Sequence, residues 1–294
     1  MKKLKGVYVP AVTFFDEAGE IDFQAVKLHA DFLIGCGVDG IVYLGTTGEF
    51  FQMTQAQKLL MIDTMSTYLR GKAKIIVGVG DTCIDNTLEL IMCAETAKAD
   101  AIIAVSPYYC IYDDAMVEAY YNALLAATDL PVIIYNIPVF TGFNIGADLL
   151  FRLLRKHNNL TGFKDTILDI EHLYTILPLK EEFPNFSLFC AYETQAYEML
   201  KAGADGFING TANIMPEFTV GSYRAAISGD ERQLKSLTQK MAESAQVYEV
   251  ATPMVLAIKE AVYQRIGVRG YEKLPGISLS SEKQRVIKEI LAGL

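Results

Sequence analysis

Short apolar segments alternate with amphipathic segments along most of the chain. Eight apolar segments are expected to form β-strands, at residues 7–15, 40–44, 74–80, 101–105, 131–136, 161–166, 186–191 and 206–209. Apolar positions at helical spacing predict helices between them, over residues 22–36, 54–69, 85–97, 147–156, 169–181 and 194–202 and from residue 114 onwards. Strands that are apolar throughout are typical of a parallel sheet covered on both faces.

The repeated strand–helix unit predicts the fold class. Eight such units in roughly 210 residues fit an α/β fold of the closed (β/α)₈ TIM-barrel type. The alternative is an open doubly wound sheet, but no GxGxxG follows the first strand, so its dinucleotide-binding form has no support. Residues 215–294 have helical patterning without a strand signal. We therefore expect a catalytic barrel over residues 1–214 and a helical C-terminal extension, residues 215–294, packed on it.

Composition and charge narrow the function classes. The chain has 294 residues, 51% of them hydrophobic, and a net charge of −9 with a pI near 5.0. This acidic balance argues against a nucleic-acid partner, and the lack of an apolar run of about 18 residues argues against a membrane span. The cysteines are scattered without a CxxC pair. Neither a disulfide framework nor a zinc site is therefore expected, and the cytoplasm is the predicted location.

In a (β/α)₈ barrel the active site lies at the carboxyl ends of the strands. The residues expected there are Thr46-Thr47, Tyr108-Tyr109, Tyr135, Lys164, Ala191-Tyr192-Glu193 and Asn209-Gly210-Thr211. None of these is a histidine, because His29, His157 and His172 all fall in helix-like segments. Metal chemistry that relies on histidine ligands is therefore not expected.

Lys164 is the main candidate for chemistry. A charged side chain is costly in a buried strand, but at the carboxyl end of a barrel strand a desolvated amine can lose its proton and attack a carbonyl. The imine that forms with a ketone is an electron sink. Tyr135, at the end of the adjacent strand, could transfer the protons. The alternatives are a lysine that reaches solvent or pairs with Asp165, and a tyrosine that only packs at the rim.

Two glycine-rich segments could bind anions. The turn Gly45-Thr46-Thr47-Gly48 offers backbone amides and two hydroxyls to a carboxylate, although the hydroxyls could equally satisfy the turn itself. The segment from Gly203 to Asn213 lies where barrels often bind phosphate, which keeps a phosphosugar enzyme open as a rival class. Against that rival, no arginine or lysine accompanies those glycines beyond Lys201, in the preceding helix.

Four motifs in order resemble the dihydrodipicolinate synthase and N-acetylneuraminate lyase family of class I pyruvate-dependent aldolases. They are Gly45-Thr46-Thr47-Gly48-Glu49, Ser106-Pro107-Tyr108-Tyr109, Tyr135-Asn136-Ile137-Pro138 and Gly162-Phe163-Lys164-Asp165-Thr166. The resemblance covers nearly the whole chain. It implies a lysine Schiff base with pyruvate and no other cofactor, in a homotetramer built as a dimer of dimers.

The resemblance also implies a role for individual residues. Lys164 would form the Schiff base and Tyr135 would transfer protons. Thr46 and Thr47 would bind the pyruvate carboxylate, and Thr46 would link Tyr135 to Tyr109 of a neighbouring subunit. Ala191 and Ile208 match positions that line the Schiff-base pocket.

The sequence departs from the family pattern where the second half of the substrate would bind. Phe140 stands where the synthases usually carry an arginine that holds a carboxylate, and an aromatic ring cannot make that contact. The positions that bind feedback lysine in many synthases also fail to match; they hold Gln55, Lys58, Thr82 and Asn86. The neuraminate lyases carry an acidic pair where this chain has Glu193 alone.

The run Lys164-Asp165-Thr166 and the segment 48–53 look most like 2-keto-3-deoxy sugar-acid aldolases. The resemblance therefore implies reversible cleavage of such an acid to pyruvate and an aldehyde, with Phe140, Thr166 and Glu193 facing the sugar end. The alternatives are a dihydrodipicolinate synthase, an N-acetylneuraminate lyase and, more remotely, a barrel that binds a ligand without turnover.

Overall fold

Eight parallel strands form the centre of the molecule. The computed structural model describes residues 3–273 and 277–294. The strands are β1 Gly6–Pro10, β2 Gly40–Tyr43, β3 Lys74–Gly78, β4 Ala101–Val105, β5 Val132–Asn136, β6 Leu160–Asp165, β7 Ser187–Cys190 and β8 Gly206–Phe207. Each strand pairs with the next in sequence, and β8 pairs with β1 to close the barrel. The (β/α)₈ barrel expected from the sequence is thus confirmed.

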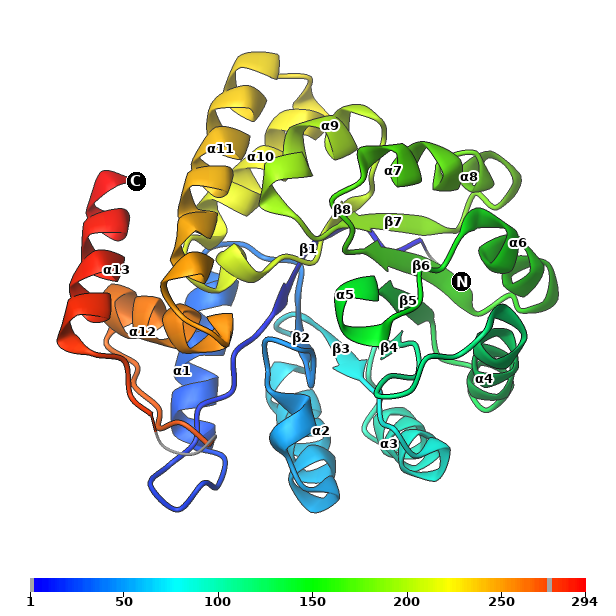
Figure 1. Cartoon of the computed structure of the whole chain (residues 1–294), viewed down its shortest axis with the longest axis horizontal. Coiled ribbons are helices and arrows are strands. Elements are labelled where there is room, and N and C mark those ends of the chain that lie inside the picture. The colour runs from blue at the N-terminus through cyan, green and yellow to red at the C-terminus, as the bar shows by residue number, and fades with distance from the viewer. Residues whose placement is uncertain (1–2, 274–276) are drawn as a thin grey trace.

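Helices surround this barrel, as Figure 1 shows. The α-helices are α1 Phe23–Gly35, α2 Gln55–Leu69, α3 Ile84–Thr96, α4 Asp114–Ala126, α5 Pro138–Thr141, α6 Ala147–Lys156, α7 Ile170–Ile176, α8 Leu179–Glu182, α9 Ala196–Lys201, α10 Pro216–Ser228, α11 Glu231–Ser244, α12 Met254–Ile266 and α13 Ser281–Gly293. Short 3₁₀ helices are η1 Phe50–Gln52, η2 Glu193–Gln195, η3 Gly210–Asn213 and η4 Ala245–Val250. Within the described residues, no helix is long and apolar enough to cross a membrane.

Several helices begin at residues that the sequence marks as caps. The side chain of Asp22 accepts hydrogen bonds from two backbone N–H groups at the start of α1, and that of Asp113 accepts one at the start of α4. Thr54 and Gln57 form a reciprocal capping box at the start of α2. Such caps satisfy N–H groups that have no partner inside the helix. These caps fix where the loops that follow β1, β2 and β4 stop.

The structure also differs locally from the sequence-based expectations. The helix expected over residues 169–181 is divided into α7 and α8, because Pro178 lies between them and cannot continue a helical hydrogen-bond ladder. Strand β5 ends at Asn136, and Pro138 is the first residue of the short helix α5. The first strand ends at Pro10, so residues 11–15 run on as a buried loop.

The C-terminal helices extend the barrel on one side, as Figure 1 shows. Helix α10 contacts both β1 and β8, which is the position of the eighth outer helix. The boundary expected at residue 214 therefore falls within the eighth β/α unit. Helix α12 contacts η3 and η4, and α13 packs on α12. Residues of this extension thereby reach the edge of the barrel where the strands end.

Candidate active site

Lys164 and Tyr135 lie next to each other at the carboxyl edge of the barrel. Strands β5 and β6 pair in a register that sets Tyr135 opposite Lys164. The Lys164 Nζ atom lies 3.9 Å from the centroid of the Tyr135 ring. Both residues are 7% exposed. The two main candidates from the sequence are therefore brought into direct contact in a largely dry setting.

A local irregularity of β6 sets this register. Val132 pairs with Leu160, but the next residue, Ile133, pairs with Gly162, so Thr161 is an extra residue in β6. Without this bulge the first register would continue and Phe163 would lie opposite Tyr135. Bulges of this kind re-aim side chains next to functional sites. Here the bulge turns the lysine, and not the phenylalanine, towards the tyrosine.

A narrow inner cavity is lined by the candidate lysine. Lys164, Tyr135, Thr46 and Ile208 line it, and the rest of its wall is mostly apolar. Gly78 allows the wall to close, because a Cβ at this residue would lie 2.1 Å from the carbonyl oxygen of Leu44.

The loop that carries Thr46 and Thr47 is anchored from both sides. The Thr13 hydroxyl donates a 2.8 Å hydrogen bond to the carbonyl of Gly48. Glu49 is fully buried, has a positive φ of 59° and forms an ion pair with Lys259 of α12. Burial raises the pKa of Glu49, and the adjacent Lys259 ammonium opposes this rise. The loop is thus fixed by the C-terminal extension as well as by the barrel.

A wider outer cavity of about 690 Å³ opens above the inner one. Thr46 is the polar residue that lines both cavities, so the two cavities adjoin at this residue. Thr47 and Phe140 line the outer cavity together with Tyr108. Burial, reinforced by the charge of Asp81, raises the pKa of Tyr108 to about 12. Its phenol is therefore neutral at ordinary pH and can donate a hydrogen bond to a ligand.

The far wall of the outer cavity is made by residues 248–255, which run from the end of η4 to the start of α12. No sequence signal marks this wall, because the segment carries no motif and lies far from the strand ends along the chain. Apart from Glu249, every residue lining the outer cavity is uncharged. The cavity thus offers hydroxyls and apolar surface, with a single carboxylate at its rim.

Glu193 lies behind this wall. It is 3% exposed, and its Oε1 atom accepts hydrogen bonds from the Tyr248 hydroxyl at 2.7 Å and from the Thr211 backbone N–H at 3.0 Å. A Cβ at Gly210 would lie 2.6 Å from the Tyr248 oxygen, so glycine is needed for this contact. Glu193 therefore orients Tyr248, which itself lines the outer cavity. The Glu193 carboxylate also accepts the backbone N–H of Thr211, which belongs to the glycine-rich segment. That N–H is therefore not free to bind a phosphate.

The other candidate residues are more dispersed. Tyr109 is 95% exposed with a φ of 80°, a left-handed conformation that is uncommon for a non-glycine residue. Ala191 is buried just beyond β7. Thr166 follows β6, and its hydroxyl is buried without a hydrogen-bond partner among the described residues. Within the described chain, none of these three lines either cavity.

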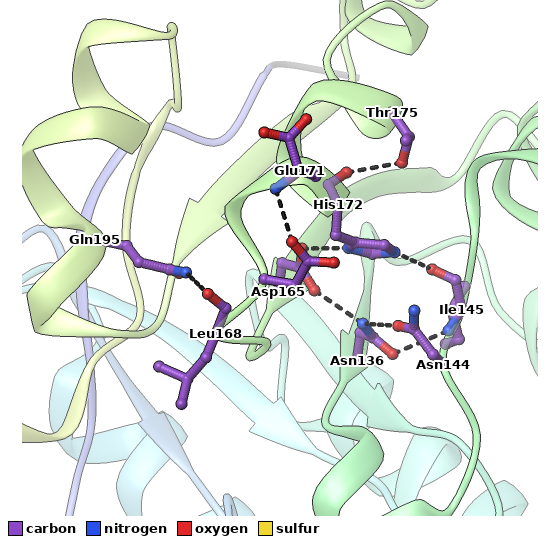
Figure 2. Close-up of polar contacts among 10 residues, drawn as sticks. Asn136, Asn144, Ile145, Asp165, Leu168, Glu171, His172, Thr175 and Gln195 are labelled. Carbon is purple, nitrogen blue, oxygen red and sulfur yellow. Dashed lines mark hydrogen bonds and ion pairs between the residues drawn. The ribbon is translucent and has the colours of Figure 1, made fainter.

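A buried polar cluster lies behind the two main candidates and has no counterpart among the sequence-based expectations. Figure 2 shows Asn136, Asp165 and His172 joined by hydrogen bonds on the side of β5 and β6 that faces the helices. The sequence places His172 in a helix and argues against a metal ligand there, without indicating a further role. The signal that could have found it is its seven-residue spacing from Asp165, which follows Lys164 directly.

Comparisons with known proteins agree with this geometry. Residues 3–293 match the family model described as the Dihydrodipicolinate synthetase family. The Escherichia coli K12 protein named "Probable 2-dehydro-3-deoxy-D-pentonate aldolase YjhH" is 35% identical over 294 residues, covering 99% of this chain and 97% of that protein. A 4-hydroxy-tetrahydrodipicolinate synthase from Natronomonas pharaonis is 30% identical, covering 98% of this chain and 97% of the synthase.

Among solved structures, YagE from E. coli K12, a prophage protein of the dihydrodipicolinic acid synthase family crystallised with pyruvate, superposes with a TM-score of 0.95. It is 29% identical and covers 99% of this chain and 98% of its own. The fold and the strand-end site define a (β/α)₈ lyase of the pyruvate aldolase type. The chain belongs to the dihydrodipicolinate synthetase family, as its four motifs led us to expect.

Proposed function

We propose that this protein is a class I aldolase that holds pyruvate as an imine on Lys164 and reversibly cleaves a 2-keto-3-deoxy sugar acid. The observation that carries the proposal is the buried contact between Lys164 Nζ and the Tyr135 ring, 3.9 Å apart, at the bottom of two contiguous cavities. A lysine that only reached for solvent would not end in an apolar inner cavity. Family membership supports carbon–carbon lyase chemistry.

Imine formation would use the inner cavity. The substrate carboxylate would bind at the Thr46–Thr47 turn, which places the C2 carbonyl towards Lys164. The amine attacks C2, and the carbinolamine hydroxyl leaves as water after it takes a proton from Tyr135. Loss of water leaves the imine nitrogen protonated and Tyr135 as a phenolate. The protonated imine is itself the electron sink, so this route requires neither a metal nor an organic cofactor.

Cleavage would then occur at the boundary between the two cavities. The Tyr135 phenolate removes the proton from the C4 hydroxyl, the C3–C4 bond breaks, and its electron pair moves to the imine to give an enamine. The aldehyde leaves through the outer cavity. Protonation of C3 and hydrolysis of the imine release pyruvate and restore Lys164. The same steps in reverse form the carbon–carbon bond.

The outer cavity supports a neutral, hydroxylated aldehyde half. Phe140 lines the place where a synthase arginine would hold a second carboxylate. Tyr108 and Thr252 offer hydroxyls to sugar hydroxyl groups. The name of the E. coli relative YjhH, a 2-dehydro-3-deoxy-D-pentonate aldolase, points to the same substrate class.

Two alternatives remain within the family. The 30% identity to a named 4-hydroxy-tetrahydrodipicolinate synthase favours a synthase, but the outer cavity wall gives its anionic aldehyde no cation. Three of the four positions where many synthases bind feedback lysine are internally paired here: Gln55 with Glu89, and Lys58 and Asn86 with Asp81. An N-acetylneuraminate lyase would need free acidic groups near the sugar, whereas Glu193 is already bonded to Tyr248.

We also propose that the protein acts as a homotetramer in the cytoplasm, with Tyr109 reaching the site of a neighbouring subunit. The 95% exposed ring of Tyr109, held in a left-handed conformation, supports this role, because an interface would bury it. The cysteines are all free thiols, which suits a reducing compartment. Ala191 and Thr166 would act through the shape of the site.

Borohydride reduction in the presence of pyruvate tests the proposal. Mass spectrometry should show one pyruvate-derived adduct on Lys164. The Lys164→Ala variant should lose the adduct and its turnover by on the order of 10⁴-fold or more. The matched control, Lys201→Ala, removes a surface lysine of α9 and should keep both. A folded wild-type protein that forms no adduct would contradict imine chemistry.

A substrate panel separates the family alternatives. Cleavage of 2-keto-3-deoxypentonate or 2-keto-3-deoxygluconate, with little reaction of neuraminate or aspartate semialdehyde, is the expected result. Preference for aspartate semialdehyde would support a synthase and overturn the sugar-acid assignment. An adduct without turnover of any panel member would identify a binding protein that has kept the lysine.

A further inference from the structure

The polar cluster of Asn136, Asp165 and His172 lies directly behind the reactive pair. Asn136 follows Tyr135, Asp165 follows Lys164, and the two neighbours are themselves paired in the strand register. Successive strand side chains point to opposite faces. The reactive pair therefore faces the inner cavity. The cluster lies on the opposite face, and Figure 2 shows it joined to His172 of α7.

Asn136 uses its amide to join several segments. Its Nδ2 donates 2.8 Å hydrogen bonds to Asp165 Oδ1 and to Asn144 Oδ1, and its Oδ1 accepts one of 3.0 Å from the Ile145 N–H. Asn136 is fully buried and Asp165 is 3% exposed. Buried polar groups that are fully bonded rigidify their surroundings. The amide thus fixes the ends of β5 and β6 relative to each other.

His172 of α7 faces an acceptor with each of its ring nitrogens. Nδ1 lies 2.7 Å from Asp165 Oδ2, and Nε2 lies 3.2 Å from the carbonyl oxygen of Ile145. A neutral imidazole carries only one N–H, so one of these contacts would then bring two lone pairs together. When Asp165 is ionised, only the imidazolium can donate to both acceptors. The geometry therefore favours a positive charge on His172.

The charged groups around His172 agree with this requirement. Burial acts to lower the pKa of His172, but the hydrogen bond and charge of Asp165 outweigh it and raise that pKa. Asp169, which caps α7, adds to the rise. On the neighbouring strands, Asp165 stands opposite the buried thiol of Cys190 and the neutral amide of Asn136. Neither of these two side chains supplies a positive charge. His172 is therefore the group that balances Asp165.

We propose that His172 is a positioning residue of the imine site: its imidazolium cancels the charge of Asp165 and locks the Asn136–Asp165 pair behind Tyr135 and Lys164. The inference rests on the proposed function of Lys164 as the nucleophile. A carboxylate beside the lysine along the chain, left without its counter-charge, would favour the ammonium form of Lys164, which cannot attack a carbonyl. His172 keeps the amine available while Asp165 still holds the strand ends.

The pH dependence of imine formation tests this role. The rate of pyruvate-dependent adduct formation under borohydride is measured from about pH 6 to about pH 9, in the range where histidine and perturbed lysine groups titrate. For His172→Gln the midpoint of the rise should move to higher pH by about one unit, since the residue next to Lys164 in the chain then carries an uncompensated charge. The double variant, His172→Gln with Asp165→Asn, should return the midpoint towards that of the wild type.

The matched control is His157→Gln. His157 ends α6 and contacts the uncharged Asn122 side chain at 2.8 Å, so its loss should leave the midpoint unchanged. A merely structural role for His172 would lower the rate at every pH without moving the midpoint, and that result would overturn the proposal. The proposal would also be overturned if folded His172→Gln formed the adduct at the full rate with an unchanged midpoint.

Direct observation of the ring in wild-type protein does not require a folded His172 variant. Nitrogen NMR near neutral pH should show both ring nitrogens of His172 protonated; the His157→Gln spectrum and the low pKa of His29 identify the other two rings. A neutral tautomer would contradict the proposal even if His172→Gln failed to fold. Failure of wild-type protein to form any pyruvate adduct would instead contradict the proposed function, so the two failures are distinguishable.

Discussion

The inner and outer halves of the candidate site are built in different ways. Lys164 and Tyr135 of the inner half stand on paired strands whose register is fixed by backbone hydrogen bonds and by the cluster behind them. The outer half is walled by Phe140 on the four-residue helix α5 and by residues 248–255 of the C-terminal extension. The inner half is rigid because neither strand can shift alone. The outer half consists of loops and helix ends.

This difference suggests a division of labour. Imine chemistry needs the amine, phenol and carboxylate site at fixed mutual distances, which strands provide. Choice of the aldehyde needs a surface that can change without disturbing them, and loops at a barrel edge allow that. Thr46, Phe50 and Val105 line both cavities, and Thr46 alone of these three carries a polar side chain. Thr46 is therefore the expected point of coupling between the halves.

The largest effect should follow from damage to the inner half. Tyr135→Phe removes the proton-transfer group while the ring that contacts Lys164 stays, so the imine should still be trapped by borohydride. Turnover should fall by about 10² to 10⁴-fold, the usual contribution of a positioned acid–base group. Steady-state kinetics and adduct mass on the same sample check both parts. Unchanged turnover would remove Tyr135 from the mechanism.

A smaller and more selective effect is expected in the outer half. Phe140→Arg places a cation in the outer cavity, which should lower kcat/KM for a neutral sugar acid by about 10-fold, since one altered pocket contact is worth roughly 1–3 kcal/mol. The rate of pyruvate trapping should not change. Val139→Arg is the control, because Val139 is 72% exposed on the same helix and lines neither cavity.

Equal losses in pyruvate trapping and in cleavage for Phe140→Arg would contradict the separation of the two halves. A gain of activity towards aspartate semialdehyde in Phe140→Arg would strengthen the case for this separation. That gain would show that a single side chain in the outer half can move the aldehyde preference without any change at Lys164.

The contrast also explains how far the sequence could be used for prediction. The barrel and its strand ends follow from local apolar periodicity, so the sequence alone places Lys164 and Tyr135 at one edge. Residues 248–255 lack such a signal, because their position depends on how α12 packs against the barrel. The sequence leads us to expect Glu193 to face the sugar; the structure instead places it behind Tyr248. The donors that bind the buried Glu193 carboxylate lie far from it along the chain, so no local sequence pattern marks its position.

The bulge at Thr161 is another feature that the sequence conceals. Leu160-Thr161-Gly162 has no residue that requires a register shift, yet the shift sets Lys164 opposite Tyr135. Pairing across strands is decided by the packing of the whole sheet and not by one segment.

The smallest effect should appear in stability and should be confined to the inner half. The pKa of His172 is raised in the folded protein by Asp165, against the effect of burial. Stabilisation from the His172–Asp165 pair is therefore complete below the unfolded pKa of about 6.5 and is lost as the pH rises through the folded value. A hydrogen bond between charged partners contributes about 1.5–3 kcal/mol, which sets the upper limit of the loss.

Urea unfolding of wild-type protein and His172→Gln, followed from about pH 5.5 to about pH 9, checks this prediction, in a range that spans the histidine pKa. The difference in unfolding free energy between the two should be largest at the acidic end and should shrink as the pH rises. His29 titrates in another window, because burial lowers its pKa to about 4. It makes stability increase with pH below about 6.5 in both proteins, so it cancels in the difference. A difference that grew with pH would mean that His172 is neutral in the folded protein, and the Asn136–Asp165 pair would then have to hold the inner half without a counter-charge.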